Sequence, residues 1–458
     1  MERLMGAPLS DDGFTTRLLD KLHHIRLADL DQRTQQAARH HLLDTVALIY
    51  GGSREETTGI AEATLAAARP PGGLPVLGRE RRADVLDATF IMAVAGHSLE
   101  FDDGFSPGAA HPGVVTVPAA LAVGNLVHAS GEAVLEAIVA GYETITSIAR
   151  TAHPMLRGRG FHPTATAGVF AAAAAAGRLL NLDADEQRNA FGLAASSAGG
   201  LAAFVQGGDD LKRLHVGHAA REGVFAALLA KQGAAAPPYA IEGPKGFFAA
   251  FVDRTDVTGT AIDQTWGITQ CYIKPWPCCG NLLSSIDATL RLRREHGFSG
   301  EDVATLEVDT YRAAADRAAT PWTTAASAQL SFPYLLATAL LFGTIRLDHF
   351  SGAARANTDV EAMAQRFSFH SSDAMNARYP AGRPSRVKIT LKDGRSFERD
   401  VNDALGSPSL PLSEDALAQK FVNLAVMVTN ETSARALHAA WAGIAEVADI
   451  GVLFATPR

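Results

Sequence analysis

The sequence has little cysteine, and the cysteines it has are clustered. All three, Cys271, Cys278 and Cys279, lie within nine residues. An odd number of neighbouring cysteines predicts no disulfide framework and indicates a reducing compartment. A structural zinc site is not expected either, because four suitably spaced soft ligands are missing.

Long apolar runs and blocks of one charge are also missing. No uninterrupted apolar stretch of about twenty residues occurs, so the sequence predicts no membrane-spanning helix. The N-terminal residues lack a basic segment followed by an apolar core, which argues against a secretory signal and predicts a cytoplasmic protein. With a net charge of −8 and no polybasic block, neither nucleic acid nor a membrane surface is an expected partner.

Motifs that bind nucleotide phosphates are absent as well. The sequence has no GxGxxG after a predicted strand and no P-loop, so no nucleotide cofactor is indicated. We therefore expect a protein that works without a cofactor.

What the sequence does have is helical periodicity over most of its 458 residues. Apolar and small residues recur at helical spacing through most of residues 13–270 and return at 413–446. Strand signals occur between these regions, in TLEVDTY at 305–311 and in a hairpin at 386–401 with an Asp-Gly turn. We predict a mostly α fold, in which residues 1–269 and 406–458 form a large all-helical domain and residues 270–405 a smaller α+β domain.

The stretch HSLEFDDGFSPGAAHPGVVT, residues 97–116, concentrates titratable side chains in a segment that glycine and proline prevent from forming a regular helix. Small apolar residues on both sides predict helices. A polar loop between buried helices is a common place for acid/base chemistry. The alternative is a solvated loop whose aspartates cap the next helix. Its titratable residues are His97, Glu100, Asp102, Asp103 and His111.

Two further segments carry cationic or titratable groups. Lys212, Arg213, His215 and His218 lie within seven residues of an otherwise acidic chain, which predicts a positive pocket for an anionic substrate. The alternative is a solvated helix start, which we prefer for Arg213. His162 precedes an alanine-rich helix whose N-terminus suits a carboxylate; the alternative is a histidine that caps a neighbouring helix.

Several motifs, in order along nearly the whole chain, resemble the MmgE/PrpD family. They are HSLEFDDGFSPGAAHPGVVTVPAALA, GYE, GRGFHPTATAGVF, LKRLHVGHAAREG, IEGPKGF, KPWPCC and SFPY. That family includes 2-methylcitrate dehydratases, cis-aconitate decarboxylases and iminodisuccinate epimerases. The resemblance implies a helical domain made from both ends of the chain, an α+β lid, a homodimer, a metal-free site and small polycarboxylate substrates.

The resemblance also implies a set of site residues. By position these are Glu100, His111, His162, Lys212, Lys274 and Tyr334. From the residues themselves we add Asp102, Asp103, His215 and Cys279. We predict that Lys274, His111, Asp102, Lys212, Cys279 and Tyr334 are catalytic, and that Glu100, Asp103, His162 and His215 bind substrate.

The expected chemistry is proton transfer next to a carboxylate, which needs cations to offset the developing negative charge and a base matched to the working pH. Gly104 stands where the decarboxylase pattern has threonine, and Cys279 where it has histidine. These departures favour an epimerase of an iminodisuccinate-type substrate, with Cys279 as one proton carrier if Lys274 favours its thiolate. The alternatives are a 2-methylcitrate-type dehydratase or a cis-aconitate-decarboxylase-like lyase, and, from another class, a non-catalytic dimer that binds carboxylates.

Overall fold

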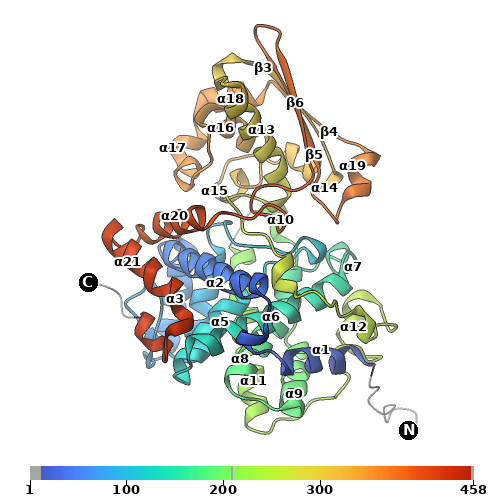
Figure 1. The fold of residues 1–458 in the computed structure, drawn as a ribbon, viewed down its shortest axis with the longest axis vertical. Helices are drawn as coiled ribbons and strands as arrows, with labels where there is room; N and C mark the ends of the chain where they lie inside the picture. Colours follow the sequence, from blue (N-terminus) through green and yellow to red (C-terminus); the bar gives the residue numbers. More distant parts are fainter. Residues whose placement is uncertain (1–11, 208–209, 455–458) are drawn as a thin grey trace.

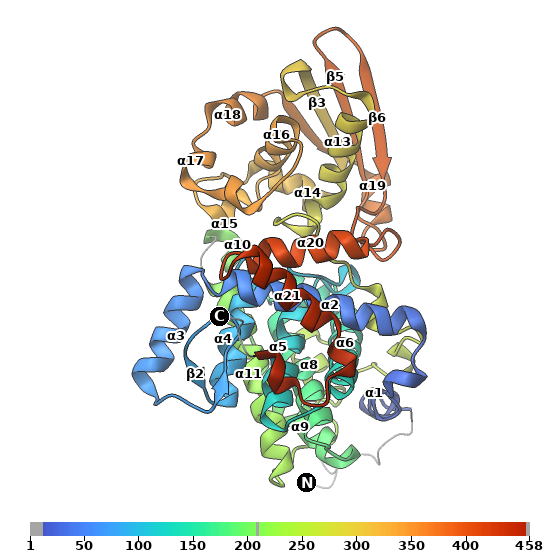
Figure 2. The same ribbon diagram turned by 60° about the vertical axis from the view of Figure 1, so that its left-hand side comes forward.

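A computed structural model describes residues 12–207 and 210–454, and within them the chain is mostly helical, as predicted. Figures 1 and 2 show a large helical unit and, beyond it along the longest axis, a smaller unit built on a sheet. The two units have separate clusters of buried apolar side chains. We call residues 272–404, which supply the second cluster, the sheet unit, and the rest the helical unit.

The helical unit packs long helices closely because small residues line their contacts. At Gly223 an added Cβ would lie 2.3 Å from the Val169 carbonyl oxygen, so this crossing needs glycine. The helices before residue 272 are α1 (Phe14–His23), α2 (Gln32–Gly52), α3 (Glu56–Ala68), α4 (Val85–His97), α5 (Gly113–Leu126), α6 (Gly131–Ala152), α7 (Met155–Gly158), α8 (Pro163–Leu179), α9 (Ala184–Ser196), α10 (Phe204–Gly207), α11 (Leu211–Lys231) and α12 (Phe247–Val252), with a short hairpin of β1 (Leu74–Pro75) and β2 (Arg82–Ala83).

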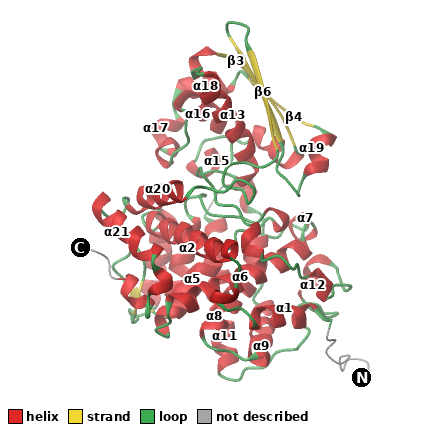
Figure 3. Ribbon diagram, in the orientation of Figure 1, coloured by secondary structure: helices red, strands yellow, loops and turns green. Residues whose placement is uncertain are grey.

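The sheet unit contains one four-stranded sheet with the order β4-β3-β5-β6, which Figure 3 shows at the end of the molecule far from the helical unit. The strand β3 pairs parallel with β4 and antiparallel with β5, and the predicted β5–β6 hairpin is confirmed. The elements are α13 (Leu283–His296), β3 (Val303–Thr310), α14 (Arg312–Ala315), α15 (Ala325–Ala328), α16 (Phe332–Phe342), α17 (Gly352–Arg355), α18 (Thr358–Ala364), β4 (Phe367–Ser371), α19 (Asp373–Arg378), β5 (Ser385–Leu391) and β6 (Ser396–Val401).

After the sheet unit the chain returns to the helical unit through α20 (Glu414–Ala425) and α21 (Glu431–Ala442). The helix α20 packs on α2, at the junction with the sheet unit (Figure 1). Buried Lys420 on α20 pairs with Asp44 on α2 at 2.6 Å and donates to the carbonyl oxygens of Phe101 and Lys274. One buried ammonium thus ties together two loops that are far apart in the sequence.

Across residues 12–207 and 210–454, no helix combines the length and the apolar character that crossing a membrane requires.

Candidate active site

The acidic loop lies between α4, which ends at His97, and α5, which begins at Gly113. Its backbone is tightly bent, with Glu100 and Ala109 at positive φ angles of 52° and 50°. Gly104 exchanges two backbone hydrogen bonds with Tyr272, of 3.0 and 2.8 Å. This bridge holds the loop against the segment that carries Lys274.

Asp103 points away from the pocket and supports the loop from behind. Its carboxylate accepts hydrogen bonds from Tyr142 Oη at 2.6 Å and from the Gly113 amide at 3.0 Å, and it lies 2.9 Å from His41 Nδ1. Binding the first amide of α5 is the capping role that we named as the alternative for this loop. The expectation that Asp103 binds substrate is therefore not supported, because its oxygens are buried and already occupied.

Asp102 and His111 form a buried carboxylate–imidazole pair. Asp102 Oδ2 lies 2.9 Å from Nδ1 of His111 and 2.9 Å from Nδ1 of His97. His111 Nδ1 also lies 2.7 Å from the Asp103 carbonyl oxygen. Both neighbours are acceptors, so Nδ1 carries the proton, and in the neutral ring Nε2 keeps its lone pair.

Glu100 forms ion pairs with two lysines that lie in different segments of the chain. Lys212 at the start of α11 contacts Oε2, and Lys274 Nζ lies 3.3 Å from Oε1 and 2.9 Å from the Glu100 carbonyl oxygen. Lys274 is also 3.6 Å from Asp102 Oδ1. Burial alone would raise the pKa values of Glu100 and Asp102, but the neighbouring cations and imidazoles hold both well below their usual range.

Lys274 is fully buried and is a poor candidate for a base. Burial lowers its pKa, but Glu100 and Asp102 outweigh this effect and raise the pKa above its usual value. Lys274 is therefore a permanent cation at neutral pH. The pKa of the neighbouring Cys278 is raised, because burial outweighs the attraction of Lys274. The ammonium group of Lys274 is held by Glu100 and Asp102, and the role of Cys279 as a proton carrier stays a prediction.

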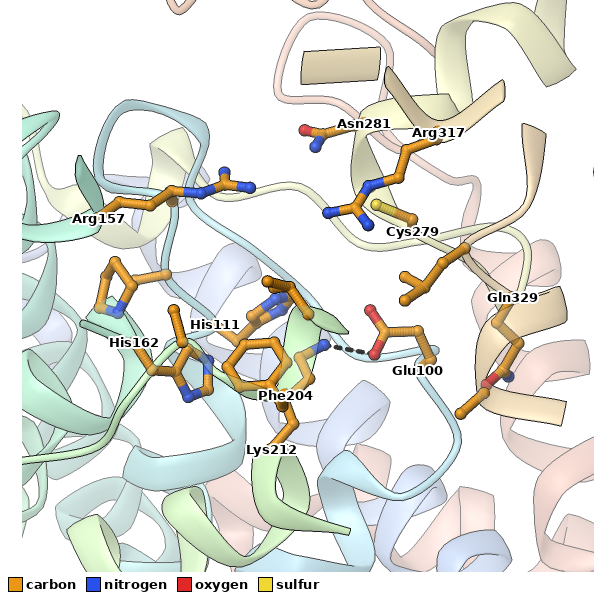
Figure 4. Close-up of a pocket in the computed structure, with 18 of the residues that line it drawn as sticks. Glu100, His111, Arg157, His162, Phe204, Lys212, Cys279, Asn281, Arg317 and Gln329 are labelled. Atoms are coloured by element: carbon orange, nitrogen blue, oxygen red, sulfur yellow. Dashed lines mark hydrogen bonds and ion pairs between the residues drawn. The ribbon is translucent and has the colours of Figure 1, made fainter. Parts of the chain in front are cut away.

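A pocket opens in front of these groups, with a cavity volume of about 140 Å³. That is roughly ten times the volume that one water molecule needs, which is enough for a small organic acid. Figure 4 shows Glu100, His111 and Lys212 together on its floor, with residues of the sheet unit above. Five lysine and arginine side chains line it against one carboxylate, that of Glu100: Arg157, Lys212, Arg213, Arg317 and Arg383. In a chain of net charge −8, this local excess favours an anionic ligand.

The structure brings together seven of the ten predicted site residues. Glu100, His111, His162, Lys212 and Cys279 line the pocket, and Asp102 and Lys274 lie directly behind the first two. Asp103, Tyr334 and His215 do not line it. The Tyr334 hydroxyl donates to the His349 carbonyl oxygen inside the core of the sheet unit. His215 lies behind His162, with ring centroids 5.6 Å apart, and lines a separate hollow with His218.

Several residues of the site carry no recognisable signal in the sequence. Arg317 and Arg383 reach the pocket from positions with no motif around them, and Arg157 stands directly before the GRGFHP motif without belonging to it. Arg213, for which we preferred a solvated helix start, lines the pocket and donates to the Ser98 carbonyl oxygen at 3.1 Å. Lys420 is 146 residues from Lys274 and 319 residues from Phe101, the two residues whose carbonyl oxygens it contacts. A lone arginine or lysine on a helix is most often a solvated side chain, so only the fold identifies these.

Burial of His97 predicts an acid-sensitive fold. Burial lowers the pKa of His97 from 6.5 to about 4, although Asp102 partly opposes the shift. The unfolded chain therefore binds a proton between about pH 6.5 and about pH 4 that the folded protein does not, and stability falls as the pH falls through this window. Unfolding by urea should show His97→Gln losing less stability than wild type between about pH 7 and about pH 4.5, by up to about 3 kcal/mol. The control His24→Gln changes an exposed histidine and should lose stability with falling pH as the wild type does. If His97→Gln also behaved like the wild type, His97 would not be the cause of the acid sensitivity.

Gly104 and Tyr272 are predicted to be coupled. A Cβ at position 104 would lie 2.3 Å from Tyr272 Oη, so Gly104→Ala should lower the free energy of unfolding by about 1–3 kcal/mol through overpacking. In the double variant Gly104→Ala/Tyr272→Ala the clash is gone, and the combined loss should be smaller than the sum of the single losses. Thermal unfolding of all four proteins gives this comparison, and strictly additive losses would contradict it.

Within the described part of the chain, no group of three or more histidine, cysteine, aspartate or glutamate side chains is arranged to hold a metal ion.

Comparison with known families and proteins gives a consistent result. Residues 16–260 match the MmgE/PrpD N-terminal domain and residues 276–442 match the MmgE/PrpD C-terminal domain. The chain is 27% identical over 473 aligned positions to a cis-aconitate decarboxylase-like protein of Aspergillus oryzae, covering 96% of each. It is 24% identical to a cis-aconitate decarboxylase of Aspergillus terreus, covering 96% of this chain and 95% of the relative. The cis-aconitate decarboxylase of Homo sapiens is 26% identical over 90% of this chain and 88% of its own length.

Proposed function

The chain belongs to the MmgE/PrpD family of enzymes, and from this premise we propose that it is a lyase that removes carbon dioxide from a small unsaturated tricarboxylate of the cis-aconitate type. The relatives that are named cis-aconitate decarboxylases align over nearly the whole chain. They favour the lyase that we gave as an alternative over the epimerase that we placed first. The single observation that carries the proposal is His111, oriented by Asp102, at the floor of a cationic pocket.

In this decarboxylation, electrons move from the departing carboxylate toward a second carboxylate of the substrate. The bond between the departing carboxylate and its carbon breaks, its electron pair forms a new C=C bond, and the former C=C pair moves to the carbon next to a second carboxylate. That carbon takes a proton, and carbon dioxide leaves. The negative charge that develops spreads onto the second carboxylate, where a fixed cation stabilises it.

The residues of the site match these demands. Lys212 lines the pocket, and Lys274 lies behind it, where Glu100 holds both ammonium groups. His111 presents Nε2 to the pocket, with its side chain 14% exposed, and in the imidazolium form it supplies the proton. Asp102, 2.9 Å from Nδ1, orients the ring so that Nε2 faces away from the carboxylate.

A second candidate is a 2-methylcitrate-type dehydratase. The observation that favours it is the tautomer of His111, since Nδ1 donates to Asp102 and Asp103 and the neutral ring offers Nε2 as a base. Such a base removes the proton next to a carboxylate, after which the hydroxyl group on the adjacent carbon leaves with a proton.

One experiment separates these reactions. Purified protein is given carboxyl-labelled cis-aconitate, citrate or 2-methylcitrate, and the products are followed by NMR with detection of labelled carbon dioxide. The proposal predicts labelled carbon dioxide and a decarboxylated, unsaturated product from the cis-aconitate-type substrate. Formation of a C=C bond from a hydroxy acid without carbon dioxide would select the dehydratase. Binding of the acids without any reaction would leave the non-catalytic carboxylate-binding protein and overturn the proposal.

The family resemblance also supports three broader proposals. We propose that the sheet unit acts as a lid over the pocket, because it contributes Cys279, Arg317 and Arg383 to the lining. We propose a homodimer, which light scattering on the purified protein would test. A cytoplasmic, cofactor-free enzyme remains our prediction, and retention of activity after dialysis against a chelator would support the part that concerns metals.

A further inference from the structure

Three arginines of the pocket differ from the lysines on its floor in having no anionic partner. Arg157, Arg317 and Arg383 line the cavity, and among the described residues none of them forms an ion pair with a carboxylate. Lys212 and Lys274, in contrast, are both engaged by Glu100. The pocket therefore has a charge-balanced floor and an uncompensated upper part.

The three arginines come from both units of the molecule. Arg157 lies on α7 of the helical unit, whereas Arg317 follows α14 in the short 3₁₀ helix Asp316–Ala319 of the sheet unit. Figure 4 shows these two side chains extending toward each other from opposite sides of the pocket, above the level of Glu100 and His111. An anion held by both would connect the two units.

Arg383 is the third arginine of the lining, and its guanidinium is also positioned to bind an anion. Its guanidinium lies over the ring of Tyr272, 4.6 Å from the centroid, which fixes its plane. Its Nε and Nη1 atoms are buried and lack a hydrogen-bond partner, which is costly unless a ligand supplies the acceptors. At Gly280 an added Cβ would lie 2.6 Å from Nη1. Any larger residue at position 280 would therefore displace the guanidinium group.

We propose that Arg157, Arg317 and Arg383 form a distal anion subsite, which takes a carboxylate that does not react and so selects tricarboxylates over dicarboxylates. This rests on the proposed function only for the kind of anion. Guanidinium groups bind a carboxylate through two parallel N–H donors, and three cations facing one space repel one another until an anion enters. The subsite lies away from His111, so it acts on binding more than on the chemical step.

Binding of an inert acid tests this without relying on turnover. Tricarballylate has three carboxylates and no double bond or hydroxyl group, and glutarate keeps the same five-carbon chain with one carboxylate fewer. Titration calorimetry on the wild-type protein should show tighter binding of tricarballylate than of glutarate. Arg157→Gln, Arg317→Gln and Arg383→Gln should each weaken tricarballylate binding about 10- to 100-fold and change glutarate binding much less.

Matched variants show whether the effect belongs to the pocket. Arg159→Gln is two residues from Arg157 but exposed and outside the lining, and Arg386→Gln lies on the outward face of β5 beside Asp400. Both should bind like wild type. Arg383→Lys keeps the positive charge but lacks the two parallel N–H donors of the guanidinium group. It should bind tricarballylate more tightly than Arg383→Gln does, which separates loss of recognition from misfolding. Equal losses for both acids, or losses no larger than in Arg159→Gln, would overturn the subsite.

The outcome is distinguishable from failure of the proposed function. If no substrate is decarboxylated but tricarballylate binds in an arginine-dependent way, the lyase proposal fails and the subsite stands. If decarboxylation is observed while the arginine variants keep the wild-type preference for three carboxylates, the subsite fails and the lyase stands. In an active enzyme, the same variants should raise KM and leave kcat nearly unchanged.

Discussion

Replacing His111 by glutamine is expected to lower kcat by about 10²- to 10⁴-fold, which is the usual contribution of a positioned acid or base. Glutamine is polar and of similar length, and its amide can still donate to the Asp103 carbonyl oxygen that His111 Nδ1 contacts at 2.7 Å. The loop should therefore keep its shape while Nε2 and its proton are lost. Steady-state kinetics on the substrate that the panel identifies, with circular dichroism as a check on folding, gives the measurement.

The control for this prediction is His128→Gln, at an exposed histidine that pairs with Asp449 far from the pocket. It should leave kcat unchanged. A His111→Gln protein that is folded and retains more than about a tenth of the wild-type kcat would remove His111 from the role of proton carrier, and with it the observation on which the proposed function rests.

Replacing Lys274 by alanine is expected to abolish turnover and also to destabilise the protein by about 3–5 kcal/mol, the usual result of removing one partner from a buried ion pair. Lys274 is 0% exposed and compensates Asp102, which is buried, and Glu100, whose side chain is 12% exposed. Without it, two carboxylates share one buried region with Lys212 and two imidazoles. From the sequence alone we would expect loss of turnover in a protein that stays folded; the burial of Lys274 adds an expected loss of stability.

Chemical denaturation should show the loss, and its pH dependence identifies the cause. The pKa values of Glu100 and Asp102 are lowered and that of Lys274 is raised by folding. The carboxylates therefore stabilise the fold above about pH 4 and lose this contribution as the pH falls through their folded pKa values. Lys274 contributes fully below about pH 10 and loses its effect as the pH rises through its folded pKa.

A suitable reference is Lys245→Ala, which removes an exposed lysine. The difference in unfolding free energy between the Lys274→Ala and Lys245→Ala proteins should be large at neutral pH and shrink below about pH 4. A Lys274→Ala protein as stable as the reference at neutral pH would show that the buried charges are compensated without Lys274.

The fold illustrates which elements local patterns can predict. The β5–β6 hairpin carries an Asp-Gly turn, with Gly394 at a φ of 90°, and is apparent from the sequence. The strand β4 is not apparent from the sequence, because its residues closely follow α18 and its pairing with β3 is parallel and distant in sequence. Parallel pairs need a crossover, so no short-range signal marks them.

The candidate site likewise contains residues whose position the sequence predicts and residues whose position it does not. His111, Glu100, Lys212 and Lys274 stand within distinctive motifs, and the structure places them together. Tyr334 also stands in a motif, yet its hydroxyl points into the core of the sheet unit. Asp102 and Asp103 are neighbours in the sequence with different tasks, one beside His111 and the other under α5.

From the sequence by itself one could establish the family, the mostly helical class and the loop that carries the acid and base groups, because these are set by local periodicity, by glycine and proline, and by residue types that need each other for chemistry. The tertiary structure alone decided which face each of those groups presents, that Lys274 is a compensated cation, and that three arginines far apart in the sequence meet over the pocket. The reason is physical: a pKa and an unpaired charge depend on desolvation and on neighbours a few ångströms away, and those neighbours here are up to several hundred residues apart along the chain, as Lys420 and Phe101 are.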